Sequence, residues 1–278
     1  MNVMQGKTLI QTKERRRCIM LIMSTRAGAG MRAERIILLL VKWFNVDINA
    51  GKGELMKFKA VLFDLGGTLI KTAEVPEIFR RILRTYGVKA DPDQIFAAHK
   101  ANEKEFDVET GQAELGMVFW HNWNLAIIKR LGVERDAQLL ARKISEVWWD
   151  YADLQFYPDV VETLAQLIAK QVKTGIVTNG PREDCEQVLK RLGATSCFDV
   201  TVGVDSCSKA KPDSKIFLYA VEKLQLEPAE VLFVGDKVER DYEGAKRAGL
   251  KPLLINREGK TLENVDSIQN LAEVLLYF

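Results

Sequence analysis

Short apolar blocks recur along the chain from residue 60 onwards, each bounded by turn-forming or charged residues. The block 60–63 contains no polar residue, which is typical of a strand buried on both faces of a parallel sheet. After residue 158 such blocks alternate with stretches whose apolar residues recur every three or four positions, the spacing of a helix packed on one side. This alternation predicts an α/β fold built on a Rossmann-like parallel sheet. The predicted strands are 60–63, 172–178, 198–203, 231–235 and 252–255, and the predicted helices are 158–171, 181–192, 213–224, 239–248 and 267–277.

Residues 71–157 show only the helical spacing. The expected helices are 75–86, one beginning after the capping residue Asp91, 112–131 and 136–151. The sequence therefore predicts a small helical bundle inserted into the α/β core, which comprises residues 56–70 and 158–278. Aromatic residues at helical spacing usually fill a bundle core, in which one or two can also face a pocket, and a cage around a ligand is the alternative. The tryptophans concerned are Trp120, Trp123, Trp148 and Trp149.

Composition narrows the class of protein. The 278 residues are 47% hydrophobic and 28% charged, as in an ordinary globular protein. The net charge is +2, but residues 1–55 carry ten Lys and Arg against four Asp and Glu, so the remainder is mildly acidic. This balance gives no support to nucleic-acid binding, and no apolar run approaches the length of a membrane span. The four cysteines lack metal-ligand spacing, which favours free thiols in a cytoplasmic protein.

Residues 1–55 form a basic extension with three interpretations. The segment Arg15–Arg17 followed by six apolar residues resembles a signal peptide, but the apolar core is too short. Residues 32–44 are compatible with an amphipathic surface helix. Residues 53–56, Gly-Glu-Leu-Met, match a ribosome-binding site read in frame before a start codon, so the extension is also explained by an over-extended start.

Polar residues follow several of the predicted strands. Asp64 follows the first strand, Thr178 and Asn179 end the second, and Asp236 follows the strand 231–235. Because parallel strands end on one edge of the sheet, these groups are expected to converge there, together with Asp241 and Lys211. Three acids in one small site need a cation, and ligands that are all oxygen favour Mg²⁺.

These residues resemble the four motifs of the haloacid dehalogenase superfamily, with a helical cap inserted after the first motif. Asp64-Leu65-Gly66-Gly67-Thr68 is similar to motif I, Thr178 to motif II, Lys211 before Pro212 to motif III, and Asp236 with Asp241 to motif IV. Taken singly, Lys211 is better explained as a solvated loop lysine and Asp241 as an acid in the first turn of a helix, whereas the full set of motifs favours the functional interpretation of both.

The resemblance implies phosphoryl transfer through an aspartyl-phosphate on Asp64. It further implies that Thr178 and the Asn179 amide hold phosphoryl oxygens and that Lys211 neutralises charge beside Asp64. The implied Mg²⁺ ligands are Asp64, the carbonyl of Gly66, Asp236 and, directly or through water, Asp241.

Gly66 departs from the pattern of phosphatases in this superfamily, which have a second Asp there as general acid and base. We interpret the chain as a Mg²⁺-dependent hydrolase of a small phosphate ester, monomeric or homodimeric, with Glu74, His99 and His121 as candidate replacement acids. A catalytically weak phosphate-binding or protein-interaction module is the alternative that Gly66 favours. A 2-haloacid dehalogenase is the third, and the acids Asp236 and Asp241 argue against it.

Overall fold

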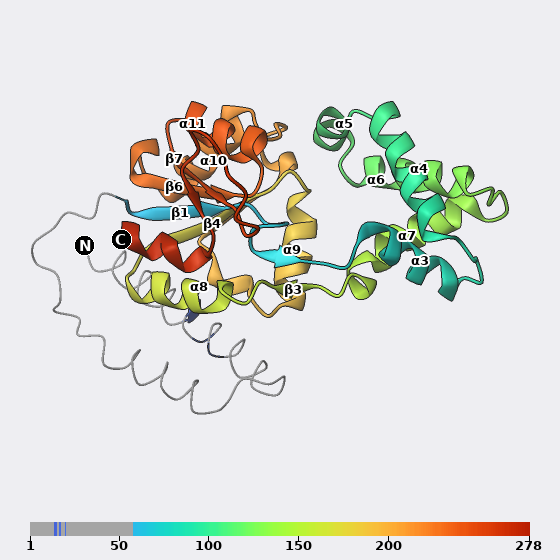
Figure 1. Ribbon diagram of the computed structural model, residues 1–278, viewed down its shortest axis with the longest axis horizontal. Coiled ribbons are helices and arrows are strands. Elements are labelled where there is room, and N and C mark those ends of the chain that lie inside the picture. Colours follow the sequence, from blue (N-terminus) through green and yellow to red (C-terminus); the bar gives the residue numbers. More distant parts are fainter. Residues whose placement is uncertain (1–13, 16, 18–19, 21–57) are drawn as a thin grey trace, which may run out of the picture.

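A computed structural model describes residues 14, 15, 17, 20 and 58–278. The core is a six-stranded sheet with strand order β5-β4-β1-β6-β7-β8, and every neighbouring pair is parallel. Figure 1 shows this core beside a separate group of helices, α3 to α7. The strands are β1 (Ala60–Phe63), β4 (Lys173–Val177), β5 (Val200–Val202), β6 (Val231–Gly235), β7 (Lys251–Ile255) and β8 (Ser267–Ile268).

The strand β1 lies at the centre of the sheet and is buried on both faces. Val61 and Phe63 pack into one hydrophobic cluster, whereas Ala60 and Leu62 pack into the cluster on the opposite face. This alternation follows from the two-residue repeat of a strand, so the uninterrupted apolar block reflects two covered faces. The predicted α/β fold with a parallel sheet is confirmed.

Helices and helical turns cover both faces of the sheet. Helices α8 (Val160–Ala169) and α9 (Arg182–Arg191) and a 3₁₀ segment (Leu271–Tyr277) cover one face, and α10 (Ser214–Leu224) and α11 (Gly244–Arg247) cover the other. A π-helical turn (Val238–Glu243) precedes α11. Short 3₁₀ turns occupy Thr195–Cys197, Val204–Ser206 and Pro228–Glu230.

The helices α3 to α7 form the inserted cap, which has its own hydrophobic cluster. They are α3 (Val75–Thr85), α4 (Pro92–Glu105), α5 (Val108–Leu115), α6 (Met117–Arg130) and α7 (Ala137–Tyr151). The chain enters the cap after β2 (Ile70–Lys71) and leaves it before β3 (Gln155–Phe156), and these two strands pair with each other in antiparallel fashion.

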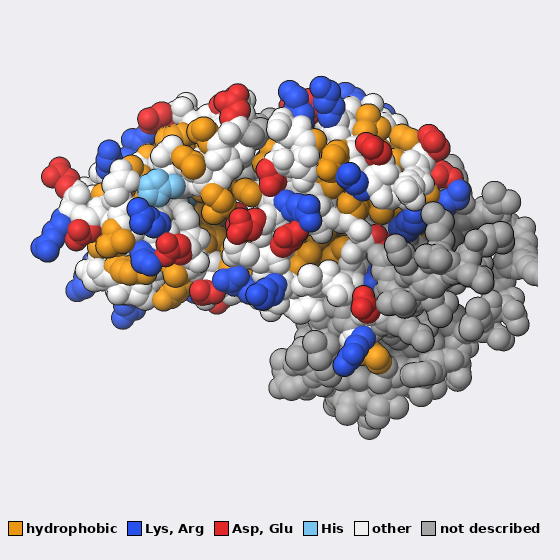
Figure 2. All heavy atoms as spheres, turned by 180° about the vertical axis from the view of Figure 1, so that it is seen from behind, with side chains coloured by type: hydrophobic (Ala, Val, Ile, Leu, Met, Phe, Trp, Pro, Cys, Tyr) orange, Lys and Arg blue, Asp and Glu red, His pale blue; other side chains and the backbone are white. Residues whose placement is uncertain are grey.

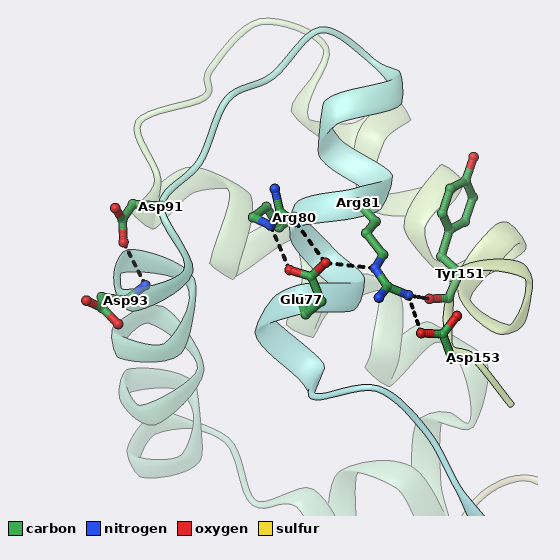
Figure 3. A network of polar contacts seen from close by, with 7 residues as sticks. All are labelled: Glu77, Arg80, Arg81, Asp91, Asp93, Tyr151 and Asp153. Carbon is green, nitrogen blue, oxygen red and sulfur yellow. Dashed lines mark hydrogen bonds and ion pairs between the residues drawn. The ribbon is translucent and has the colours of Figure 1, made fainter. Parts of the chain in front are cut away.

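Ion pairs hold the two ends of the cap together. Glu77 accepts hydrogen bonds from both Arg80 and Arg81 on α3, and the Arg81 guanidinium also binds the Asp153 carboxylate at 2.7 Å. Arg81 donates a further hydrogen bond to the Tyr151 carbonyl (Figure 3). Because Arg81 and Asp153 are 72 residues apart in the chain, this contact fixes the exit of the cap beside its entry.

Two predicted helices were wrong in part. The expected helix 112–131 is broken, since α5 ends and α6 begins at Gly116, whose φ of 53° interrupts the helical hydrogen bonding. The expected helix 267–277 begins as strand β8, which pairs with β7, and only Leu271–Tyr277 is helical, with 3₁₀ geometry. In both cases an apolar pattern that fits a helix is divided by local backbone geometry.

The basic extension, residues 1–55, lies outside the described residues except at four positions. One of these, Arg15, is buried against the core, where its guanidinium binds the Asp199 carboxylate at 2.7 Å and the Thr174 hydroxyl at 2.6 Å. A charged pair so nearly excluded from water needs such hydrogen bonds to offset its desolvation. Arg15 is therefore a contact between the extension and the sheet.

Candidate active site

Three carboxylates converge at the carboxyl edge of the central strands. Asp64 directly follows β1, Asp236 directly follows β6, and Asp241 lies in the π-helical turn that leads into α11. One carboxylate oxygen from each lies within 4.8 Å of the others. Gly235 permits this approach, because a Cβ atom at that position would lie 2.4 Å from the Asp241 side chain.

Lys211 lies between two of these acids. Its Nζ donates to Oδ1 of Asp64 at 2.6 Å and to Oδ1 of Asp241 at 2.7 Å, and its side chain is 3% exposed. The Asn179 side chain holds the Lys211 backbone from both sides, because its amide donates to the Lys211 carbonyl and its carbonyl accepts from the Lys211 N–H. Lys211 is thus a fixed charge at the end of β1.

Burial and neighbouring charges shift the pKa values of this pair. Burial raises the pKa of Asp64 to about 6, although the adjacent Lys211 charge acts in the opposite direction. Burial also tends to lower the pKa of Lys211, but the charges of Asp64 and Asp241 outweigh it and the net shift is upward. Lys211 therefore stays protonated at neutral pH, and its one positive charge does not balance three carboxylates.

The remaining motif residues lie at the same edge. Thr178 follows β4, and its hydroxyl accepts a hydrogen bond from the Gly180 N–H at 3.2 Å, which leaves the hydroxyl hydrogen able to donate. Gly67 has φ of 82°, and a Cβ there would lie 2.6 Å from Asp236. Gly66 differs, because its φ is not in the left-handed region and no heavy atom lies within 4 Å of an added Cβ.

A cavity of about 900 Å³ extends from this edge to the cap. Asp64, Thr178, Asn179, Lys211, Asp236 and Asp241 line it on the core side. All four described tryptophans, Trp120, Trp123, Trp148 and Trp149, line it on the cap side while also packing against the hydrophobic cluster of the cap. The expected packing in the core of the bundle is confirmed, and all four of these residues, rather than one or two, also face the cavity.

The three candidate replacement acids occupy different places. Glu74 and His99 line the cavity, whereas His121 is not among its lining residues and is paired with Gln138. Trp123 donates its indole N–H to Nδ1 of His99 at 3.3 Å, so a neutral His99 carries its hydrogen on Nε2. Burial lowers the pKa of His99 to about 4, which keeps the ring uncharged at neutral pH.

The donor set fits a hard divalent cation. The candidate ligands are carboxylates within 4.8 Å of one another, and the two lysines paired with them, Lys211 and Lys237, leave part of their negative charge unbalanced, which would attract a cation. Both oxygens of Asp241 already accept hydrogen bonds, from Lys211 and from the Lys237 backbone N–H, which favours a water-mediated contact for this residue. Asp64 and Asp236 are the better placed to bind a metal directly.

The fold and the site together combine a parallel sheet covered by helices on both faces, three converging carboxylates, a buried lysine and a helical cap. A family model described as a haloacid dehalogenase-like hydrolase matches residues 58–249, and the chain belongs to that family. The resemblance inferred from the four motifs is thereby confirmed at the level of the family.

Named relatives include enzymes of two kinds. The glyceraldehyde 3-phosphate phosphatase of Methanopyrus kandleri is 31% identical over 202 residues, which cover 72% of this chain and 84% of that protein. An (S)-2-haloacid dehalogenase of a Pseudomonas species is 32% identical over a shorter region, 45% of this chain and 59% of that protein. The crystal structure of a phosphatase of this family from Thermococcus onnurineus is 29% identical with a TM-score of 0.54, covering 78% of this chain and 96% of that one.

Sequence reasoning missed two features of the site. The Asn179 side chain holds the Lys211 backbone, a role for which only its position beside Thr178 gives a hint. The cavity also contacts Lys237, whose exposed ammonium pairs with Asp236 at 2.8 Å.

On the face seen in Figure 2, charged side chains of both signs are interspersed. Within the described part of the chain, no helix is long and apolar enough to cross a membrane.

Proposed function

We propose that this chain is a Mg²⁺-dependent phosphatase that hydrolyses a small phosphorylated metabolite through an aspartyl-phosphate on Asp64. The observation that carries the proposal is the pairing of the buried Lys211 with Asp64 at 2.6 Å, in a cavity lined by two further acids. A dehalogenase needs a nucleophilic carboxylate but no metal-binding acids, so the set of Asp64, Asp236 and Asp241 favours phosphoryl transfer.

In the first step the Asp64 carboxylate attacks phosphorus, a P–O bond forms to Asp64, and the bond to the leaving-group oxygen breaks. Lys211 neutralises negative charge on Asp64 and on the phosphoryl oxygens as they approach. The Thr178 hydroxyl and the Asn179 backbone N–H hold phosphoryl oxygens. Asn179 thus acts twice, because its side chain positions Lys211 while its backbone faces the phosphate.

In the second step a water molecule attacks the phosphorus of the aspartyl-phosphate, which releases inorganic phosphate and regenerates the Asp64 carboxylate. Asp64, Asp236 and the Gly66 carbonyl would hold Mg²⁺, with Asp241 contacting it through water. When bound, the ion offsets the repulsion between the nucleophile and the phosphate dianion. No carboxylate stands at position 66 to protonate the leaving oxygen or to deprotonate water, so good leaving groups are favoured.

The test is phosphate release from acetyl phosphate and phenyl phosphate, with Mg²⁺, with chelator, and in Asp64→Asn. We expect turnover that requires both the metal and Asp64. Release of halide from 2-chloropropionate without phosphatase activity would assign the chain to the dehalogenases instead. Binding of phosphate without turnover of either ester would favour the weak phosphate-binding module that Gly66 suggests.

A further inference from the structure

The cap side of the cavity contains a group of aromatic rings. Its lining includes Phe79 from α3, Trp120 and Trp123 from α6, and Trp148 and Trp149 from α7, which we call the aromatic wall. Three helices of the cap therefore present rings to one cavity. Four of the five rings pack in two pairs, with Phe79 edge-on against Trp148 at 5.5 Å and Trp120 against Trp123 at 5.9 Å between ring centroids.

The aromatic wall carries no charge of its own. His99 lies among these rings, with its centroid 4.8 Å from that of Phe79, and its low pKa keeps it neutral. The charged cap residues that line the cavity are all solvent-exposed, and two of them, Lys100 and Glu103, neutralise each other at 2.7 Å. A second charged group on the substrate would therefore meet no buried counter-charge on the aromatic wall.

We infer that the leaving group of the substrate is an uncharged apolar or aromatic body that packs against the aromatic wall. This inference rests on the proposed phosphatase function and deepens it, because it names the class of ester. A phosphate at Asp64 and Lys211 fills only one end of a cavity of about 900 Å³, a size within the range of about 300–1,000 Å³ for sites that enclose drug-sized ligands. A small polar phosphate ester would leave the rings of the aromatic wall without a partner.

The first test is a series of straight-chain alkyl phosphates from ethyl to octyl. The leaving oxygen is an equally strong base throughout, so kcat/KM reports packing of the chain and not the chemistry of departure. Burying one methylene contributes enough to raise kcat/KM by about threefold to fourfold per added carbon until the cavity is filled. Glyceraldehyde 3-phosphate is the small polar comparison, and we expect its kcat/KM to be lower than that of hexyl phosphate.

A matched pair of variants tests the aromatic wall itself. Phe79 and Phe119 are both buried in the hydrophobic cluster of the cap, at 1% and 3% exposure, but only Phe79 lines the cavity. Phe79→Leu should lower kcat/KM for 2-naphthyl phosphate by about 2-fold to 10-fold relative to acetyl phosphate, as expected for loss of an aromatic contact. Phe119→Leu should leave that ratio unchanged, and thermal unfolding of both variants shows whether stability changes equally.

The outcomes separate this inference from the function on which it rests. If acetyl phosphate is turned over in an Asp64-dependent reaction but the alkyl series is flat, or glyceraldehyde 3-phosphate is the better substrate, the apolar leaving group is wrong and the phosphatase stands. If neither acetyl phosphate nor phenyl phosphate is hydrolysed, both fail. If kcat/KM rises along the alkyl series but Phe79→Leu leaves the ratio of kcat/KM for 2-naphthyl and acetyl phosphate unchanged, the role of the aromatic wall is wrong. If Phe79→Leu does not fold, the alkyl series measured with the parent protein still tests the apolar leaving group.

Discussion

We predict that Gly66 limits the leaving groups that this site can expel. An alkoxide must be protonated as it departs, whereas a phenolate is a much weaker base and leaves unaided, so a missing general acid penalises alkyl esters selectively. Phenyl and cyclohexyl phosphate have similar size and apolar character, so comparing them isolates leaving-group basicity from packing. The parent enzyme should hydrolyse phenyl phosphate at least about 10²-fold faster, the lower end of what a positioned acid contributes.

Gly66→Asp should restore much of the missing catalysis. The backbone at Gly66 is not left-handed, and an added Cβ would meet no heavy atom within 4 Å, so the structure accommodates the first atom of a side chain there. The rate on cyclohexyl phosphate should rise by about 10-fold or more, while the rate on phenyl phosphate changes little. Gly67→Asp is the control, because a Cβ there lies 2.6 Å from Asp236 and would displace it, so this variant should lose activity on both esters.

Stopped-flow measurement of the chemical step with both esters provides the assay. Equal rates for the parent on phenyl and cyclohexyl phosphate, in a step shown to be chemistry, would refute the reasoning and mean that another residue supplies the proton. Glu74 is then the first residue to replace, because it lines the cavity. His99 is uncharged at neutral pH and His121 is not among the residues that line the cavity.

Three further predictions concern metal, pH and the basic extension. Lys211→Ala and Asp236→Ala should both reduce turnover, but only Asp236→Ala should raise the Mg²⁺ concentration for half-maximal rate, and equal metal dependence would contradict these roles. At low Mg²⁺ concentration, activity should decrease as the pH is lowered through about 6, because burial raises the pKa of Asp64 to about 6 and the nucleophile must be ionised. Added Mg²⁺ favours the carboxylate and should therefore move this decrease in activity to lower pH. If Mg²⁺ does not move it, the result would count against Asp64 as a ligand. Deleting residues 1–55 should preserve turnover but lower the free energy of unfolding by about 1.5–3 kcal/mol, because the charged hydrogen bonds of Arg15 are lost. An inactive truncated protein would show that the extension has a further role.

Much of the core could be predicted because its strands are buried on both faces and therefore appear as uninterrupted apolar blocks. The convergence of Asp64 and Asp236 followed from topology alone, since each directly follows a strand and parallel strands end on one edge. To predict the position of these residues it was enough to know which strand precedes each of them, and the orientation of their side chains was not needed.

The cap could be predicted only as a set of helices. Periodicity cannot show that Gly116 adopts a positive φ and divides a continuous pattern into two helices. Nor can it distinguish a tryptophan that fills the cluster of the cap from one that also faces the cavity, because Trp120 and Trp123 do both. The residues that line the cap side of the cavity could therefore be identified only from the structure.

The most direct test of the central claim is to identify the phosphorylated residue during turnover. The protein is quenched in the steady state with acetyl phosphate and Mg²⁺ and is then treated with borohydride. Borohydride reduces an aspartyl-phosphate to homoserine, and peptide mass spectrometry locates the homoserine in the sequence. We predict homoserine at position 64 in the parent and none in Asp64→Asn, which should unfold within a few degrees of the parent temperature. Homoserine at another position, or turnover by Asp64→Asn above about one per cent of the parent rate, would contradict the account.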